Sequence, residues 1–172
     1  LRLRSDIEVG TYLSGGLDSS IITSISSNKS SKPLKTFSVC FDNSSIDESY
    51  YQDLLLKHLN ISNNIVCVKE STIIENLTSA LWHAETPVFR TAFVPMFLLS
   101  KLARLLGVHV VLTGEGADET FLGYNLFKET VILSNWDKYK NDAARIKQIS
   151  KLYPYVNDFK KRASILHGLY KK

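Results

Sequence analysis

Residues 9–20 of the chain read VGTYLSGGLDSS. The apolar run over residues 9–13 stops at Gly15 and Gly16, which predicts a strand that ends in a sharp turn. Asp18 stands where a helix would begin, because acidic side chains suit the first turn of a helix. The apolar residues that follow at helical spacing are Ile21, Ile22 and Ile25. The stretch therefore predicts a strand, a tight turn and a helix in immediate succession.

Strands and helices continue to alternate beyond this stretch. Further strands are expected over residues 34–41, 65–68 and 108–112, and helices after Asp47 and over residues 71–83 and 91–106. This alternation predicts an α/β fold with a doubly wound parallel sheet. The unbroken apolar run over residues 108–112 predicts a strand buried on both faces. The rest of the chain, from residue 117, is expected to be mostly helical, with breaks at Asn135 and Pro154.

A second glycine-rich turn follows the last predicted strand, where residues 113–119 read TGEGADE. We call residues 14–20 the first turn and residues 113–119 the second turn. In doubly wound sheets, ligands bind beyond the carboxyl ends of the strands, where the winding direction reverses. We therefore expect the two turns to meet at one end of one sheet. Either turn alone would also suit a plain strand-to-helix loop with solvated acids; the two together favour a ligand site.

The first turn has the composition of an anion cradle. Glycines let the backbone approach a ligand closely, and the helix that follows points free N–H groups at the turn. Ser14, Ser19 and Ser20 add hydroxyl groups. The pattern predicts phosphate or pyrophosphate binding, although it matches neither the Walker-type nor the dinucleotide-binding glycine motif. A carboxylate beside phosphates needs a cation, so we expect Asp18 and Asp118 to hold one Mg²⁺.

Composition bounds the class of protein. The 172 residues are 44% hydrophobic and 22% charged, as in an ordinary globular domain, which excludes a disordered or fibrous chain. No apolar run reaches the roughly 18 residues of a membrane span. The net charge of +4 is too small to predict nucleic-acid binding, and the basic cluster at residues 160–162 fits a solvated helix face.

Two cysteines are too few for a disulfide framework, so a reducing, cytoplasmic location is expected. Cys40 and Cys67 both fall in predicted strands, where we expect buried, inert thiols. Alternation over residues 34–41 places Phe37 and Val39 on one face and Cys40 on the other. Because the chain begins with Leu1, we expect it to be part of a longer protein.

The first turn is similar to the pyrophosphate loop of the N-type ATP pyrophosphatases. Within that group, the chain most resembles the synthetase domain of the glutamine-dependent asparagine synthetases, from residue 1 to about residue 130. Three stretches carry the resemblance: RSD at 4–6 leading into LSGGLDSS at 13–20; ETP at 85–87 followed by PMFLLS at 95–100; and VLTGEGADE at 111–119 with Gly123 and Tyr124.

The resemblance implies an adenine nucleotide α-hydrolase-like fold, a Rossmann-type three-layer sandwich with a mostly helical C-terminal part. Residues 1–125 would form the ATP-pyrophosphatase-like synthetase core, and residues 126–172 a helical continuation of it. The family's N-terminal glutaminase domain and its C-terminal remainder, which carries a pyrophosphate-binding lysine, are not found in the sequence. We therefore expect the 172 residues alone to be inactive.

The resemblance also implies site residues. Those for ATP and pyrophosphate are Leu13, Ser14, Gly15, Gly16, Asp18, Ser19, Ser20, Val39, Thr113 and Gly114. Asp18 and Asp118 would hold Mg²⁺, and Glu115 would be the catalytic residue that receives ammonia and assists its deprotonation. Contacts to the substrate are expected from Arg90, Glu119 and Tyr124.

The implied reaction is an ATP-dependent, AMP-forming amide synthesis. A substrate carboxylate, aspartate or an analogue, would form an acyl-adenylate with release of pyrophosphate. Ammonia from a glutaminase domain would then displace AMP. Nucleic acid and membrane are not expected partners. Three alternatives stay open: a lactam-forming synthetase of the same family, a tRNA-modifying ATP pyrophosphatase, which the basic C-terminal third favours, and a nucleotide-binding remnant without activity.

Overall fold

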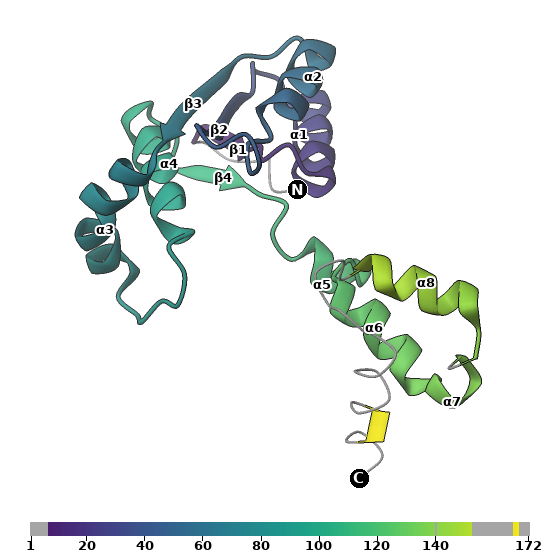
Figure 1. Ribbon diagram of the computed structural model, residues 1–172. Helices are drawn as coiled ribbons and strands as arrows, with labels where there is room; N and C mark the ends of the chain where they lie inside the picture. The colour runs from purple at the N-terminus through teal and green to yellow at the C-terminus, as the bar shows by residue number, and fades with distance from the viewer. Residues whose placement is uncertain (1–6, 140, 153–166, 169–172) are drawn as a thin grey trace. The chain divides into compact units, whose positions relative to one another are not determined.

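The computed structural model describes residues 7–139, 141–152, 167 and 168. The chain forms two compact units, Leu1–Glu115 and Gly116–Lys172, which we call the first and second unit (Figure 1). In the part of the chain that is described, no helix combines the length and the apolar character needed to cross a lipid bilayer.

The first unit is an α/β fold built on four parallel strands. The strands are β1 (Val9–Tyr12), β2 (Lys35–Phe41), β3 (Asn63–Val68) and β4 (Val110–Leu112), in the order β3-β2-β1-β4. The helices are α1 (Leu17–Lys29), α2 (Ser49–Leu59), α3 (Glu70–Ala84) and α4 (Phe93–Leu105). α1 and α2 lie on one side of the sheet and α4 on the other (Figure 1). The expected α/β fold with a doubly wound parallel sheet is confirmed.

Apolar side chains join the sheet to α4. Phe37 of β2 is fully buried in a cluster with Leu99 and Ala103 of α4 and with Val108. Val39 packs against the same cluster, because side chains two residues apart share one face of a strand. The face predicted from alternation over residues 34–41 is therefore the face that packs on α4.

Hydroxyl groups line the opposite face of the sheet. Thr11 and Ser38 are fully buried there, together with Thr23 of α1. Thr23 Oγ1 donates to Thr11 Oγ1 (3.3 Å), and Ser38 Oγ donates to the carbonyl of Leu13 (2.7 Å). Because these hydroxyls are paired, α1 can pack closely on the sheet without leaving polar groups unsatisfied.

The face that α1 buries is the small, polar one. Its buried residues are Ser19, Thr23 and Ser26, whereas Ile21 and Ile25 are 47% and 53% exposed. The apolar spacing predicted the helix, but it did not show which side faces the sheet. That side is set by the threonine and serine side chains of the strands beneath it.

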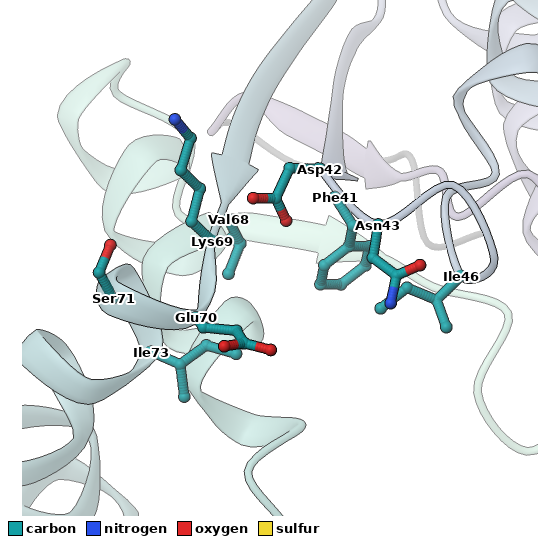
Figure 2. Close-up of a pocket in the computed structure, with 9 residues that line it drawn as sticks. All are labelled: Phe41, Asp42, Asn43, Ile46, Val68, Lys69, Glu70, Ser71 and Ile73. Atoms are coloured by element: carbon teal, nitrogen blue, oxygen red, sulfur yellow. The ribbon is translucent and has the colours of Figure 1, made fainter.

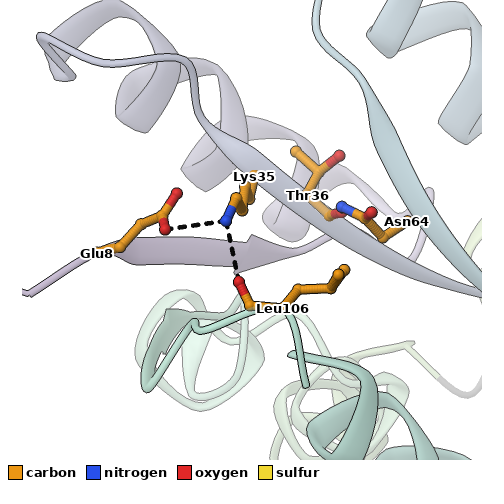
Figure 3. A network of polar contacts seen from close by, with 5 residues as sticks. All are labelled: Glu8, Lys35, Thr36, Asn64 and Leu106. Atoms are coloured by element: carbon orange, nitrogen blue, oxygen red, sulfur yellow. Dashed lines mark hydrogen bonds and ion pairs between the residues drawn. The ribbon is translucent and has the colours of Figure 1, made fainter. Parts of the chain in front are cut away.

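Polar contacts tie together the amino-terminal end of the sheet (Figure 3). Nζ of Lys35, at the start of β2, donates to Glu8 Oε2 and to the carbonyl of Leu106, both at 3.0 Å. Asn64 Nδ2 donates to the carbonyl of Thr36 (3.0 Å). The two turns lie at the opposite end of the sheet, because each of them follows the carboxyl end of a strand.

The strand β4 is less covered than its apolar sequence predicted. Among the described strands it pairs with β1 alone, at the edge of the sheet, and Val110 is 37% exposed. The expectation of burial on both faces is therefore wrong. A short strand at an edge is covered less completely than a central one, and composition alone does not reveal its position.

Cys40 and Cys67 form a disulfide between β2 and β3. The two residues are register partners in the parallel pair, with Cα atoms 4.6 Å apart. Cys67 is exposed and Cys40 half-buried, so the expectation of buried, inert thiols is wrong. Parallel pairing brings the two side chains face to face across 27 residues of sequence, which no local pattern shows.

The second unit is helical in its described residues, as expected. Its helices are α5 (Ala117–Phe121), α6 (Asn125–Ser134), α7 (Trp136–Tyr139) and α8 (Ala143–Leu152). Asn135 separates α6 from α7, and Leu133 and Trp136 on either side of it are buried. The expected break at Pro154 and the basic cluster at residues 160–162 lie outside the described residues.

Candidate functional site

The two turns follow neighbouring parallel strands and meet at one end of the sheet. β1 pairs with β4 in register from Val9↔Val110 to Thr11↔Leu112. Gly114, in the second turn, lies directly against the backbone of the first turn. A Cβ added to it would lie 2.7 Å from the nitrogen of Ser19 and 3.0 Å from Cβ of Asp18. The predicted meeting is confirmed for the start of the second turn, residues 113–115, which belongs to the first unit, and it requires glycine at position 114.

The first turn depends on the backbone of Gly15. Its φ of +97° lies in the left-handed region that favours glycine. A Cβ there would also lie 2.9 Å from the carbonyl oxygen of Glu48. Gly16 is the N-cap of α1, and no described side chain caps that helix end. The N–H groups at the start of α1 therefore face the turn with the polarity that attracts an anion.

The serine hydroxyls of the first turn form a network within it. Ser14 Oγ and Ser19 Oγ are 2.9 Å apart, and the N–H of Gly16 donates to Ser14 Oγ (3.2 Å). Ser20 Oγ donates to the carbonyl of Gly16 (2.7 Å). Ser19 is buried, whereas Ser14 is exposed. The network shapes the turn in advance, and Ser14 is its most accessible hydroxyl.

Gln52 of α2 supports the first turn from within the fold. The residue is 2% exposed, and its Nε2 donates to the carbonyls of Ser14 (3.1 Å) and Val39 (3.2 Å). The sequence offered no signal for this role, because the glutamine lies 38 residues from Ser14 in an ordinary helical pattern. The side chain joins the first turn to the end of β2.

Gln52→Leu is expected to lower the free energy of unfolding by about 1–3 kcal/mol, because two part-buried carbonyls lose their donor. Urea unfolding followed by circular dichroism measures the change. Lys57→Leu, on the exposed side of the same helix, is the matched control and should change stability by less than about 0.5 kcal/mol. Equal losses in both variants would contradict the role given to Gln52.

Asp47 connects the end of β2 to the start of α2. Its carboxylate accepts hydrogen bonds from the Ser49 hydroxyl and from the N–H of Phe41 (3.0 Å). The Ser49 hydroxyl, followed by the Phe41 N–H, lowers the pKa of Asp47 below its ordinary value of 3.8. The helix predicted after Asp47 begins at Ser49.

Asp47 is expected to stabilise the fold only while it is ionised. Because its pKa is lower in the folded than in the unfolded chain, the stabilisation is complete above the unfolded pKa and is lost as pH falls through the folded pKa, below 3.8. The difference in Tm between wild type and Asp47→Asn should therefore be present at neutral pH and close in this acidic range. Asp53→Asn, an exposed charge on α2, should show no such closing. A difference independent of pH would contradict the expectation.

Leu13 and Val39 are two of the residues expected to bind ATP. Leu13 directly follows β1, and Val39 lies in β2. The side chain of Leu13 is 1% exposed, so a ligand at this end of the sheet could reach only its backbone. Its N–H donates to the carbonyl of Phe37 (2.9 Å), and its carbonyl accepts from Ser38. Val39 is half-buried.

Thr113 and Glu115 flank Gly114 in the first unit. Thr113 is half-buried, and its Oγ1 accepts a hydrogen bond from the N–H of Glu115 (3.3 Å). Glu115, expected to be the catalytic residue, is exposed. Arg90 is exposed in the loop between α3 and α4.

The remaining expected site residues belong to the second unit. Asp118 is half-buried, and its Oδ1 occupies the space that a Cβ at Gly123 would need. Glu119 Oε1 accepts from the hydroxyl of Tyr124 (3.0 Å), whose ring stacks on Phe127. The structure thus brings Glu119 and Tyr124 together.

Asp18 lies in the first unit and Asp118 in the second unit, so the surroundings of each aspartate are given within its own unit. Over the described residues, no group of three or more histidine, cysteine, aspartate or glutamate side chains is arranged to hold a metal ion. The shared Mg²⁺ stays a prediction.

A cavity of about 520 Å³ opens beyond the carboxyl ends of β2 and β3 (Figure 2). Phe41 and Val68 contribute apolar surface, while Asp42, Lys69 and Glu70 contribute charges of both signs. None of the expected site residues lines it. No sequence motif marks this cavity, because its residues come from the ends of two strands and from the segments that follow them.

Comparison with known proteins places the chain in a known family. The sequence model of the asparagine synthase family matches residues 1–168. The chain is 36% identical over 139 residues to asparagine synthetase (glutamine-hydrolyzing) 1 of Bacillus subtilis (strain 168), covering 80% of this chain and 22% of that protein. It is 34% identical over 137 residues to asparagine synthetase (glutamine-hydrolyzing) 1 of Arabidopsis thaliana, with coverages of 73% and 23%.

A relative with another name is amidase chyE of Penicillium rubens, 32% identical over 146 residues, which cover 77% of this chain and 22% of that protein. The chain thus spans about a fifth of the length of the curated relatives it matches. Because the family model matches nearly all of its residues and relatives share up to 36% identity over most of the chain, the chain belongs to the asparagine synthase family.

Proposed function

We propose that the full-length protein is a ligase that uses ATP to form an amide. A substrate carboxylate, aspartate or an analogue, attacks the α-phosphate of ATP and forms an acyl-adenylate with release of pyrophosphate. Ammonia from glutamine, produced by a glutaminase domain, then displaces AMP. The observation that carries the proposal is the contact of Gly114 with Asp18 and Ser19, which gathers the two turns at one end of the sheet.

The first turn would bind the pyrophosphate part of ATP. The N–H groups at the start of α1 and the exposed hydroxyl of Ser14 are aligned before a ligand arrives, because the turn is held by its own hydrogen bonds and by Gln52. Such preorganised donors stabilise charge that develops on a leaving group. The other residues in this role are Gly15, Gly16, Ser19 and Ser20, with Leu13, Val39, Thr113 and Gly114 around the nucleoside.

The chemistry of Asp18 and Asp118 suits a magnesium ion. Asp18 is half-buried beside the N–H groups that would hold phosphates, and its carboxylate would repel them without a cation between. We assign Asp18 and Asp118 as its protein ligands. When bound, Mg²⁺ draws charge from the phosphate oxygens.

Residues near the second turn would bind the substrate carboxylate and take up the proton of ammonia. Glu115 presents an exposed carboxylate close after β4, suited to receive ammonia and take up its proton. Arg90, Glu119 and Tyr124 are our candidates for substrate contacts. We place the protein in the cytoplasm, where the amino-acid substrates are found.

The test is the formation of AMP and pyrophosphate by the full-length protein with Mg²⁺, ATP, glutamine and a panel of carboxylates. We expect AMP release that depends on aspartate, with one amide formed per AMP. Release that requires tRNA would favour a tRNA-modifying enzyme, and a cyclised product would favour a lactam-forming synthetase. Bound ATP without AMP release for any acceptor would refute the proposal.

A further inference from the structure

The disulfide between β2 and β3 is open to exchange with thiols in solution. Cys40 and Cys67 are register partners near the carboxyl ends of their strands. Cys67 is exposed and Cys40 half-buried, so the disulfide lies at the surface of the sheet and not in its core. Accessible disulfides of this kind exchange, whereas those sealed in a core resist it.

Two hydrogen bonds flank Cys40 along the chain and lead to α2. On one side, the carbonyl of Val39 accepts from Gln52 Nε2 (3.2 Å), which also donates to the carbonyl of Ser14 (3.1 Å). On the other side, the N–H of Phe41 donates to Asp47 just before α2 (3.0 Å). The disulfide-bonded end of β2 is thus joined to the first turn through one helix.

We propose that Cys40 and Cys67 form a thiol–disulfide site for cellular dithiols, and that its oxidation state sets how tightly the first turn holds a nucleotide. The nucleotide part rests on the proposed function. The disulfide holds the end of β2 against β3 and so keeps Val39 and Gln52 in place beneath the turn. Its reduction frees the strand ends and weakens nucleotide binding. In a reducing compartment, disulfides that do form tend to be of this sensing kind.

The exchange needs only a dithiol as co-reactant. A thiolate of the dithiol attacks Sγ of Cys67, the S–S bond breaks, and Cys40 leaves as a thiolate that takes up a proton. The second thiol of the reductant then attacks the mixed disulfide, which releases Cys67 as a thiol and the dithiol as its own disulfide. Two electrons and two protons pass from the dithiol to the cysteine pair.

The first experiment tests the site by itself. Full-length protein purified without reductant is treated with iodoacetamide before and after incubation with dithiothreitol, and the peptides that contain Cys40 and Cys67 are examined by mass spectrometry. We expect both cysteines to be alkylated only after reduction, and to be protected again after reoxidation with glutathione disulfide. Alkylation of both in the unreduced protein would overturn the site, whatever the protein does with ATP.

The second experiment measures the dissociation constant of Mg²⁺ and ATP by calorimetry for the oxidised and the reduced protein. We expect about fivefold weaker binding after reduction, at the low end of the coupling between distinct sites. The double variant Cys40→Ser with Cys67→Ser should bind as the reduced protein does and ignore dithiothreitol, which excludes an effect of other cysteines.

The wild-type comparison needs no substitution, so it stands even where the double variant fails to fold. Equal affinities in the two oxidation states would overturn the coupling. A protein that binds no ATP in either state would overturn both the coupling and the proposed function, and the alkylation experiment would still decide whether the thiol–disulfide site exists.

Discussion

Replacing Asp18 with asparagine is expected to slow pyrophosphate release by the full-length protein by about 10²–10³-fold, the usual loss when one charge-stabilising group is removed from an active site. The carboxylate is half-buried at the start of α1, where asparagine has the same shape but lacks the charge that holds Mg²⁺ beside phosphates. Pyrophosphate exchange into ATP measures the rate. Circular dichroism and Tm should show that the fold is unchanged.

The matched control for Asp18→Asn is Asp53→Asn. Asp53 is exposed on α2, and its replacement removes the same charge from the first unit. The rate of pyrophosphate exchange should therefore stay within about twofold of wild type, as for an ordinary surface substitution. If Asp18→Asn needs a higher Mg²⁺ concentration than wild type to reach half of its maximal rate, this would further support the metal role. Full turnover by Asp18→Asn would show that the metal assignment is wrong.

Gly114→Ala is expected to weaken nucleotide binding about 100-fold and to lower the free energy of unfolding by about 1–3 kcal/mol, as for an overpacked core position. The new Cβ would lie 2.7 Å from the nitrogen of Ser19 and 3.0 Å from the backbone carbon of Asp18. Backbone atoms cannot rotate away as a side chain can. The second turn must therefore move off the first, which opens the proposed site. Calorimetric titration with ATP and urea unfolding measure the two effects.

Gly107→Ala separates this clash from general effects of alanine. Gly107 also precedes β4 closely, but a Cβ there meets nothing within 4 Å, and its φ of +77° adds only backbone strain. We expect a stability loss of about 1 kcal/mol with unchanged nucleotide affinity. If Gly114→Ala binds ATP as tightly as Gly107→Ala does, the two turns do not hold the nucleotide together.

The elements of the first unit could be predicted from local patterns. The apolar spacing and the breakers around residues 9–20 indicated β1, the turn and α1, and the structure places α1 at Leu17–Lys29. Helix spacing nevertheless did not show the orientation of α1, in which Ile21 and Ile25 are exposed while Thr23 is buried. Periodicity shows that a helix has two unlike faces, but the surface beneath it decides which one is covered.

The candidate site was predictable only in part. Glycines and acids stand out in the two turns because their chemistry is specific and their order is local. Gln52 and the disulfide between Cys40 and Cys67 did not stand out. Their roles depend on which strands pair and in which register. A glutamine in a helix or a cysteine in a strand does not reveal that pairing in the sequence.

Local patterns in the sequence were enough to predict the order of strands and helices and to mark the two turns, because backbone preferences and the affinity of helix starts for anions act over a few residues. The folded chain was needed to show that β4 lies beside β1, that Gly114 closes on Ser19, and that Cys40 faces Cys67. Those outcomes depend on the packing of a whole sheet, where contacts between residues far apart in the chain form together.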